Sequence, residues 1–322
     1  MMLARWSKRC EPVLIVALLA LGCDRSDSKH ERDASAPVRP APVSEPIPQL
    51  LYLPDGGDEG PAALLPPPGG FVTPPGRCPP EMVDVRGMFC IDRYEVSLVD
   101  ARQRRPVSPH YHPTRAQTRA SFERWQRRRE TENRRIARQM PVPAPPEWQL
   151  GEDFEPRAVV VRGQLPNGYL NAELAAAACR NAGKRLCRPE EWITACRGEA
   201  DQKYPYGDDY EHGRCNVGRE AHPAGVLHGN ASIHHLDPRL NLIEHAGDPL
   251  LRRTGDTPGC ASRWGNDAVY DMVGNLDEWV DDPDGAFHGG FFSRATRDGC
   301  GARISSHPPQ YFDYSLGTRC CL

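Results

Sequence analysis

The chain has 322 residues, of which 39% are hydrophobic, and its formal net charge is −3. This length allows one large domain or two. The mildly acidic charge does not suggest a nucleic-acid partner, which would require a basic surface, and we predict none.

Residues 1–22 have the pattern of a secretory signal. Three basic residues come first, and an apolar run over residues 13–22 follows, too short to span a bilayer. Gly22 directly before Cys23 favours lipidation of Cys23, as in bacterial lipoproteins, although Ala20 replaces the usual leucine. An ordinary cleaved signal is the alternative. We therefore predict a protein of the bacterial cell envelope, lipid-anchored and periplasmic or surface-facing.

The next segment, residues 23–77, contains twelve prolines. Such a composition cannot bury enough apolar surface to fold, so we predict a disordered tether. The folded domain is expected over residues 78–322, which contain ten cysteines. An even number of cysteines in an exported chain indicates disulfide bonds.

The domain is expected to open with two short strands within residues 78–99, joined by a turn at Arg86 and Gly87. An Arg-rich insertion then spans about residues 101–150, with a helix predicted over residues 114–139 and stopped by Pro141. A sparse apolar stripe follows this helix: Phe122, Trp125, Ile136 and Met140. The insertion is either a solvated helix packed by this stripe or a basic face for anionic lipids, cell-wall polyanions or an acidic partner.

Two further helices are predicted. One covers residues 172–181, capped by Asn171 and ended by Gly183, and the other opens with Pro189. Beyond residue 203 regular periodicity fades. The pattern favours one α+β domain, rich in loops and held by crosslinks.

Four segments in this order resemble the sulfatase-modifying-factor family, whose best-known member is the formylglycine-generating enzyme. They are MFCIDRYEVS (88–97), ACRNAGKRLCRPEEWITACRG (178–198), YDMVGNLDEWVDD (270–282) with HGGFFS (288–293), and YSLGTRCC (314–321). The resemblance covers residues 78–322 apart from the insertion. It implies the family's fold, a loop-rich variant of the C-type-lectin-like architecture.

The formylglycine-generating enzyme oxidises a substrate cysteine with oxygen and a copper ion held by two thiolates. This sequence departs from that pattern, because the first copper cysteine corresponds to Arg294 and Cys300 matches a structural cysteine instead. Phe291 replaces a serine, Asp277 replaces a tryptophan, and the loop before Cys300 is shorter. The resemblance therefore implies a protein without the catalytic cysteine pair, and copper is not expected.

Iron-dependent relatives suggest an alternative metal chemistry through histidines. The histidines in question lack helical spacing, and a surface or hydrogen-bonded role is expected for each: His212, His222, His228, His234, His235 and His245. His234 and His235 are the pair to test first for a transition metal. The chain has no room for the separate helical domain that supplies most of the iron ligands in those relatives.

The resemblance also implies structural calcium. The first ligand set maps to the carboxylates of Asp271 and Glu278 and the main-chain carbonyls of Gly274 and Leu276, all oxygen ligands suited to Ca²⁺. A second set would use Asn216 and Val217, with its remaining ligands near residues 248–250. Four neighbouring carboxylates are expected to be solvated instead: Asp277, Asp281, Asp282 and Asp284.

Two disulfide bonds follow from the resemblance, Cys179–Cys320 and Cys196–Cys300. A third, Cys78–Cys90, is a local pairing across the first hairpin. For the remaining cysteines we predict Cys187–Cys215 and Cys260–Cys321, the least constrained pairs.

The sequence thus predicts a tethered binding or interaction module whose partner is a cell-envelope protein or a glycan. The competing hypotheses are a formylglycine-generating oxidase and an oxidoreductase that uses another metal.

Overall fold

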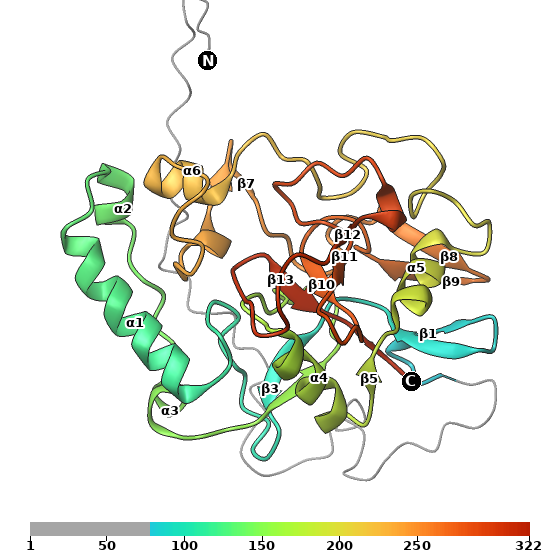
Figure 1. Ribbon diagram of the computed structural model, residues 1–322, viewed down its shortest axis with the longest axis horizontal. Helices are drawn as coiled ribbons and strands as arrows, with labels where there is room; N and C mark the ends of the chain where they lie inside the picture. Colours follow the sequence, from blue (N-terminus) through green and yellow to red (C-terminus); the bar gives the residue numbers. More distant parts are fainter. Residues whose placement is uncertain (1–77) are drawn as a thin grey trace, which may run out of the picture. The chain divides into compact units, whose positions relative to one another are not determined.

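The computed structural model describes residues 78–322, the coloured part of the ribbon in Figure 1. The predicted signal peptide, Cys23 and the Pro-rich tether lie outside the described residues. Within residues 78–322, no helix has both the length and the apolar character needed to cross a membrane.

One four-stranded sheet joins the two ends of the described chain. Its strands, in spatial order, are β1 (Met82–Val85), β2 (Phe89–Asp92), β14 (Cys320–Cys321) and β5 (Arg185–Leu186). Strands β1 and β2 form the predicted hairpin, and Arg86 and Gly87 in its loop have φ angles of 56° and 68°. Positive φ angles of this kind are what short hairpin loops require. The predicted hairpin is confirmed, and a third strand, β3 (Ser97–Asp100), begins within the same segment.

A second four-stranded sheet positions the residues of the family motif. Its spatial order is β12 (Arg303–Ile304), β11 (Phe287–His288), β10 (Asp277–Trp279) and β13 (Leu316–Thr318). Strand β10 runs parallel to β13 and antiparallel to β11. Because successive side chains of a strand point to opposite faces, the neighbours Asp277 and Glu278 face different surroundings.

Three two-stranded sheets complete the strands. They are β3 (Ser97–Asp100) with β4 (Pro156–Val159), β6 (Glu244–His245) with β7 (Asp248–Pro249), and β8 (Ala261–Trp264) with β9 (Asp267–Tyr270). Long loops connect these pairs, with three short helical turns among them: α6 (Pro223–His228), η2 (Leu240–Leu242) and η3 (Gly299–Gly301). The domain is therefore α+β and loop-rich, as predicted.

Both helices predicted after the insertion are present. Helix α4 (Ala172–Asn181) begins after Asn171, whose side chain accepts a hydrogen bond of 2.8 Å from the Leu174 amide. Helix α5 (Pro189–Arg197) starts at the predicted proline. Local capping rules located both starts because they depend on neighbouring residues alone.

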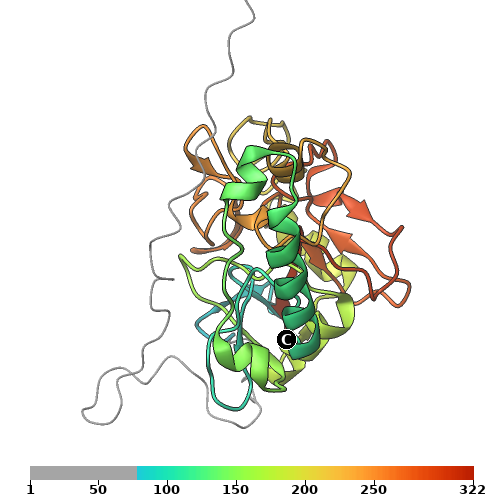
Figure 2. The ribbon, with the colours of Figure 1, turned by 90° about the vertical axis from the view of Figure 1, so that its left-hand side faces the viewer.

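The Arg-rich insertion differs from its prediction. Two helices, α1 (Arg115–Glu130) and α2 (Arg135–Gln139), replace the single helix expected over residues 114–139, and a third, α3 (Glu147–Gly151), follows. The break falls at Thr131, whose hydroxyl donates a hydrogen bond to the Arg128 carbonyl and so competes with the helical pattern. Figure 2 shows α1 running along one side of the domain. Trp125 and Met140 of the predicted stripe are each 1% exposed, so the stripe does pack the insertion onto the domain.

Five disulfide bonds use all ten cysteines of residues 78–322. Three are the pairs predicted first, Cys78–Cys90, Cys179–Cys320 and Cys196–Cys300. The two least constrained pairs were wrong, because the structure forms Cys187–Cys321 and Cys215–Cys260.

The geometry of β14 explains the corrected pairing. Cys320 and Cys321 are successive residues of one strand, so their side chains must leave on opposite faces of the sheet. Cys320 joins the buried cluster that contains Cys179 of α4, whereas Cys321 joins the cluster that contains Cys187. The longest crosslinks close more than a hundred residues each, and loop-closure entropy predicts about 4.7 kcal/mol for a bridge of that size.

Candidate functional site

A tight turn at residues 271–276 leads into β10 and carries most of the predicted calcium ligands. Asp271, Gly274 and Asn275 have positive φ angles of 61°, 86° and 58°. A Cβ atom on Gly274 would lie 2.2 Å from the Asn216 carbonyl oxygen, so only glycine fits there. The turn is therefore packed directly against the segment that carries the second predicted ligand set.

Glu278 lies in a buried ion pair. Its carboxylate accepts hydrogen bonds of 2.7 Å from both Nε and Nη2 of Arg319, and one of 2.6 Å from the Trp192 indole. The Arg319 and Glu278 side chains are at most 1% exposed. Because these hydrogen bonds pair the two buried charges, the ion pair can remain in the core.

Two more buried carboxylates lie close to this pair. Glu95 accepts hydrogen bonds from the Asn275 amide group and the Leu276 backbone, and Asp271 accepts one from the Gly255 backbone. Burial raises the pKa of Glu95 well above its usual value, and the charges of Asp271 and Glu278 raise it further. Burial also raises the pKa of Asp271 to about 7. Three buried carboxylates thus share one guanidinium, so full ionisation of all three would need a further cation.

The two carboxylates of the first calcium ligand set lie in this cluster. Glu278 already binds the Arg319 guanidinium, so Asp271, which accepts one hydrogen bond, is the carboxylate of this set that remains available to a metal. Gly274 and Leu276 lie in the same turn, where the Leu276 N–H donates to Glu95. A divalent cation would compensate the excess negative charge, and hard oxygen ligands suit Ca²⁺. The oxygens of Asp271 are of the kind that the sequence predicted, and the binding of calcium there stays a prediction.

The second set is engaged differently. The Arg219 guanidinium lies 3.3 Å from Asn216 Oδ1, 3.4 Å from the Pro249 carbonyl and 3.0 Å from Asp248 Oδ2. Asn216 Nδ2 also donates to the Leu250 carbonyl at 2.9 Å. The structure does bring Asn216 next to residues 248–250, but a guanidinium already satisfies the oxygens that a metal would need. This set does not fit calcium.

The position of the family's first copper cysteine is occupied by an ion pair. Arg294 Nη2 lies 2.6 Å from Asp277 Oδ1, which also accepts a hydrogen bond from the Gly290 backbone. Asp277 is 1% exposed, and burial raises its pKa to about 7 despite the Arg294 charge. The prediction that Asp277 is solvated was wrong, because its neighbour in the fold, Arg294, provides the buried partner. Asp281 and Asp284 are exposed, as expected, and Asp282 is half-buried.

Aromatic side chains fill the space beside this ion pair. The Phe291 ring lies edge-on to Tyr314 at 5.7 Å and to His222 at 6.1 Å between ring centroids, and the Arg294 guanidinium lies 5.7 Å from the Phe291 ring. Tyr314 Oη is 3.0 Å from His222 Nε2. Asp277 and Arg294, which both differ from the family pattern, thus neutralise each other's charge, and Phe291 packs beside them.

None of the cysteines of residues 78–322 is a free thiol. Cys300, the cysteine nearest to Arg294 in the sequence, is bonded to Cys196, and every other cysteine of residues 78–322 is also in a disulfide. A disulfide sulfur is not a thiolate and cannot serve as a Cu(I) ligand of the kind the family uses. The thiolate copper site of the formylglycine-generating enzyme therefore has no ligands among the described residues.

The histidines predicted as a possible metal cluster separate into small groups. His234 and His235 are neighbours in sequence but have different surroundings: His234 packs on Trp125, and His235 packs on Tyr314. The other four lie as follows: His222 beside Tyr314, His228 beside Trp125, His245 half-buried on β6, and His212 exposed. The predicted pair does not form a site.

Sequence reasoning missed a cavity of about 860 Å³ formed by β3, β4 and residues 241–256. Many of its lining side chains are apolar: Leu98, Val99, Val107, Val159, Val161, Leu165, Leu242 and Leu251. Three buried polar atoms of its lining residues have no hydrogen-bond partner within residues 78–322, namely His110 Nδ1, Gln164 Oε1 and Asn241 Oδ1. Burial lowers the pKa of His110 to about 4, so its ring is neutral at physiological pH. These residues come from three separate segments, and no local pattern connects them.

Comparison with known proteins identifies the family. The family model for the sulfatase-modifying factor enzyme 1-like domain matches residues 54–317. No curated protein matches the chain. Among solved structures, the Major Tropism Determinant I1 variant has a TM-score of 0.37 and 12% identity, over 77% of this chain and 54% of that one.

Two other structures are similar at the same level. CarF has a TM-score of 0.34 and 13% identity, over 72% of this chain and 85% of that one. PvdO from Pseudomonas aeruginosa has a TM-score of 0.33 and 14% identity, over 72% of this chain and 79% of that one. The family model spans well over half of the sequence, and the resemblance noted from the four motif segments is confirmed. The chain therefore belongs to the sulfatase-modifying factor enzyme 1-like domain family.

Proposed function

We propose that this chain is a non-catalytic member of its family that acts as a binding module in the bacterial cell envelope. One observation carries the proposal: all ten cysteines of residues 78–322 are in disulfide bonds. Formylglycine formation in this family depends on two copper-bound thiolates. Without them the copper-dependent oxidation has no metal ligand, and the role that we propose instead is recognition.

The contacts around Arg294 support the same proposal. The guanidinium remains protonated at any physiological pH, so it cannot coordinate a metal ion. Its ion pair with Asp277 and its contact with Phe291 take up the position that corresponds to the family's first copper cysteine.

The cavity beside β3 and β4 is the proposed binding site. Its volume of about 860 Å³ is within the usual range for ligand pockets. Gln164 Oε1 and Asn241 Oδ1 have no hydrogen-bond partner among the described residues, and neither atom is itself exposed. A small rotation of either side chain would let it accept from the hydroxyl or amide donors of a ligand that also has an apolar face. An N-acetylated envelope glycan has this chemistry, because its acetyl methyl groups and ring faces are apolar.

The binding proposal predicts that an N-acetylated disaccharide binds the purified protein and that Gln164→Leu weakens the binding about tenfold, the loss expected for one hydrogen bond to a buried acceptor. Titration calorimetry measures both affinities. Gln310→Leu is the matched control, because Gln310 contacts Glu173 outside the cavity. Binding that Gln164→Leu leaves unchanged, or no binding to any sugar in a panel of envelope glycans, would contradict the proposed site.

The envelope location rests on Cys23, outside the described residues. We expect the mature protein to partition into the detergent phase with an acylated N-terminal peptide. Cys23→Ser should release it or block its processing, because the protein then has no acyl chain. Cys10→Ser is the control, since Cys10 lies within the predicted signal and should have no effect. An unmodified N-terminus beyond Cys23 in the wild-type protein would refute the anchor.

Calcium is proposed only for the first ligand set, with Asp271 and Glu278 as its carboxylates. The support is the excess of buried carboxylates over guanidinium groups around Arg319. The ion would order the turn at residues 271–276, and it would take no part in a reaction.

A further inference from the structure

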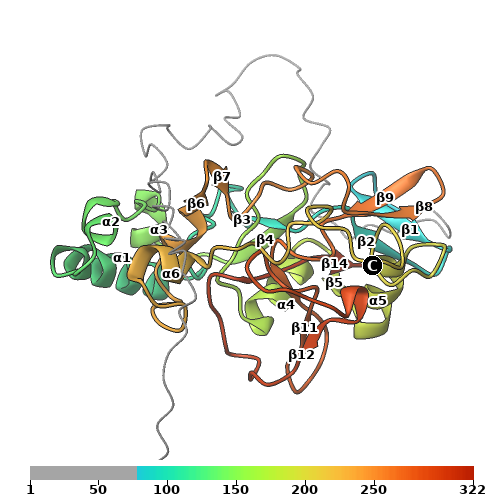
Figure 3. The ribbon, with the colours of Figure 1, turned by 90° about the horizontal axis from the view of Figure 1, so that it is seen from above.

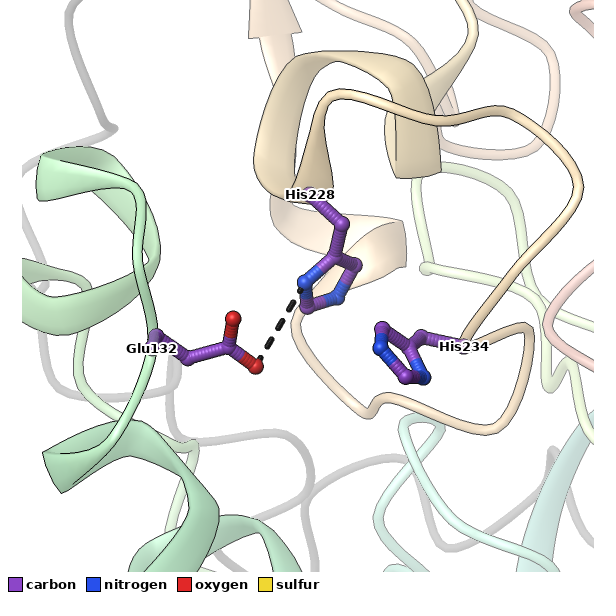
Figure 4. Close-up of side chains that lie close together, drawn as sticks. All are labelled: Glu132, His228 and His234. Atoms are coloured by element: carbon purple, nitrogen blue, oxygen red, sulfur yellow. Dashed lines mark ion pairs between the residues drawn. The ribbon is translucent and has the colours of Figure 1, made fainter.

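Three side chains with metal-ligand chemistry meet where the Arg-rich insertion contacts the rest of the domain. They are Glu132, just beyond the end of α1, His228, the last residue of α6, and His234 in the loop that follows. Their ligand atoms all lie within 4.8 Å of one another. Figure 4 shows both imidazole rings and the carboxylate directed toward a common space.

His228 is held in one orientation by a buried partner. Its Nε2 atom lies 3.0 Å from Asp237 Oδ2, and Asp237 also pairs with Arg239. Because the Asp237 carboxylate is paired with the Arg239 guanidinium, it acts as an acceptor for the proton of His228 Nε2–H. A neutral His228 then has its lone pair on Nδ1.

That lone pair has no partner of its own. The His228 side chain is 1% exposed, and Nδ1 makes no hydrogen bond to any of the described residues. The nearest group is Glu132 Oε1 at 3.6 Å, beyond hydrogen-bond distance. Two acceptors facing each other in a buried place require a cation or a proton between them. The carboxylate–histidine arrangement of Asp237 and His228 is the second-shell support that metal-binding histidines usually have.

A cation from the protein already contacts the other two ligands. Arg128 Nη2 lies 2.7 Å from His234 Nε2, and Arg128 Nε lies 3.2 Å from Glu132 Oε1. The guanidinium also lies 5.7 Å from the ring of Trp125, which packs against both histidines. Arg128 is half exposed to solvent, so its side chain can leave without opening the core. The space between the three ligands therefore attracts a cation, and the Arg128 guanidinium that is there now can be replaced by another one.

We propose that Glu132, His228 and His234 bind a divalent transition-metal ion of the zinc class, which replaces the Arg128 guanidinium. Two imidazole nitrogens and one carboxylate oxygen form a common zinc ligand set and leave a fourth position for water. Ligands around a tetrahedral zinc ion are about 3.4 Å apart, as bond lengths of ~2.1 Å require. Glu132 and His234 lie in loops, and a rotation of their side chains would close the remaining distance.

Such a site would fasten the insertion to the domain. Glu132 belongs to the insertion, whereas both histidines belong to the segment after α5, about a hundred residues later in the chain. The binding of metal would therefore couple the position of α1 to the loop at residues 229–236.

The test uses the mature full-length protein, freed of metal with a chelator and titrated with ZnCl₂, and then with CoCl₂ as a spectroscopic probe. We expect one zinc ion per chain with a dissociation constant in the micromolar range or below. The cobalt complex should show the visible absorption of tetrahedral coordination. Glu132→Gln and His234→Ala should each weaken zinc binding at least tenfold.

Arg128→Ala distinguishes this proposal from simple surface binding, because it should strengthen zinc binding by removing the competing cation. His212→Ala and His235→Ala are matched controls, and both should bind zinc like the wild type. Thermal unfolding without metal verifies that each variant is folded. The proposal is overturned if the wild type binds no zinc at micromolar concentration, if His234→Ala binds as well as the wild type, or if Arg128→Ala binds more weakly.

Discussion

The purified protein is expected to produce no formylglycine from a C-x-P-x-R peptide, even with Cu(I), a reductant and oxygen. The reaction needs two copper-bound thiolates, and residues 78–322 contain no free cysteine. The two residues that replace the family's tryptophan and first copper cysteine are paired with each other at 2.6 Å. Mass spectrometry of the peptide measures the outcome, because the aldehyde product differs in mass from cysteine.

An active formylglycine-generating enzyme is the positive control, and a reaction without enzyme sets the background. Arg294→Cys is an informative variant, since it restores one thiol at the family position but not the second. It should bind Cu(I) more tightly than the wild type and still fail to convert the peptide. Conversion by the wild type well above background, lost when a cysteine from position 179 onward is replaced, would show that the site is catalytic.

Calcium should stabilise the wild-type protein and should not stabilise Asp271→Asn. A ligand present at about a hundred times its dissociation constant adds about 2.7 kcal/mol to the free energy of unfolding. For a domain of this size that corresponds to a rise of about 5 to 10 °C in the unfolding temperature. Calorimetry or circular dichroism in calcium and in a chelator measures the difference.

Asparagine is a conservative replacement at this position. It tolerates the positive φ of 61° at residue 271, and its side-chain oxygen can still accept the hydrogen bond from Gly255. In the chelator we expect Asp271→Asn to be at least as stable as the wild type, because burial disfavours the Asp271 charge. In calcium the wild type should instead be the more stable of the two proteins.

Asp284→Asn is the control, since Asp284 is exposed and lies outside the ligand set. Equal stabilisation of the wild type and Asp271→Asn by calcium would place the ion elsewhere. If calcium does not stabilise the wild type, the proposal of a structural calcium site in this domain is refuted. Both results can be obtained without any measurement of activity, so they do not depend on the formylglycine experiment.

The sequence alone determined the features that depend on neighbouring residues or on the family motif. The cap at Asn171 and the proline at the first position of α5, Pro189, specified the starts of the two helices. The turn at Arg86 and Gly87 specified the first hairpin. The motif segments identified the family and, through it, two long-range disulfides. Each of these features is carried by a short stretch of chain or by an ordered set of such stretches.

Tertiary structure decided the features that depend on which residues meet. The partners of Cys320 and Cys321 are set by the two faces of β14, and the spacing of cysteines along the sequence does not show which face each side chain takes.

The surroundings of two candidate sites were likewise decided by tertiary structure. In the sequence Asp277 is one of four acidic residues in a polar turn, but in the fold it is buried against Arg294. Glu132 and His228 are about a hundred residues apart and meet only because the insertion packs back onto α6 through Trp125. Contacts of this kind arise from the packing of distant segments, which the periodicity and local propensities of one sequence do not contain.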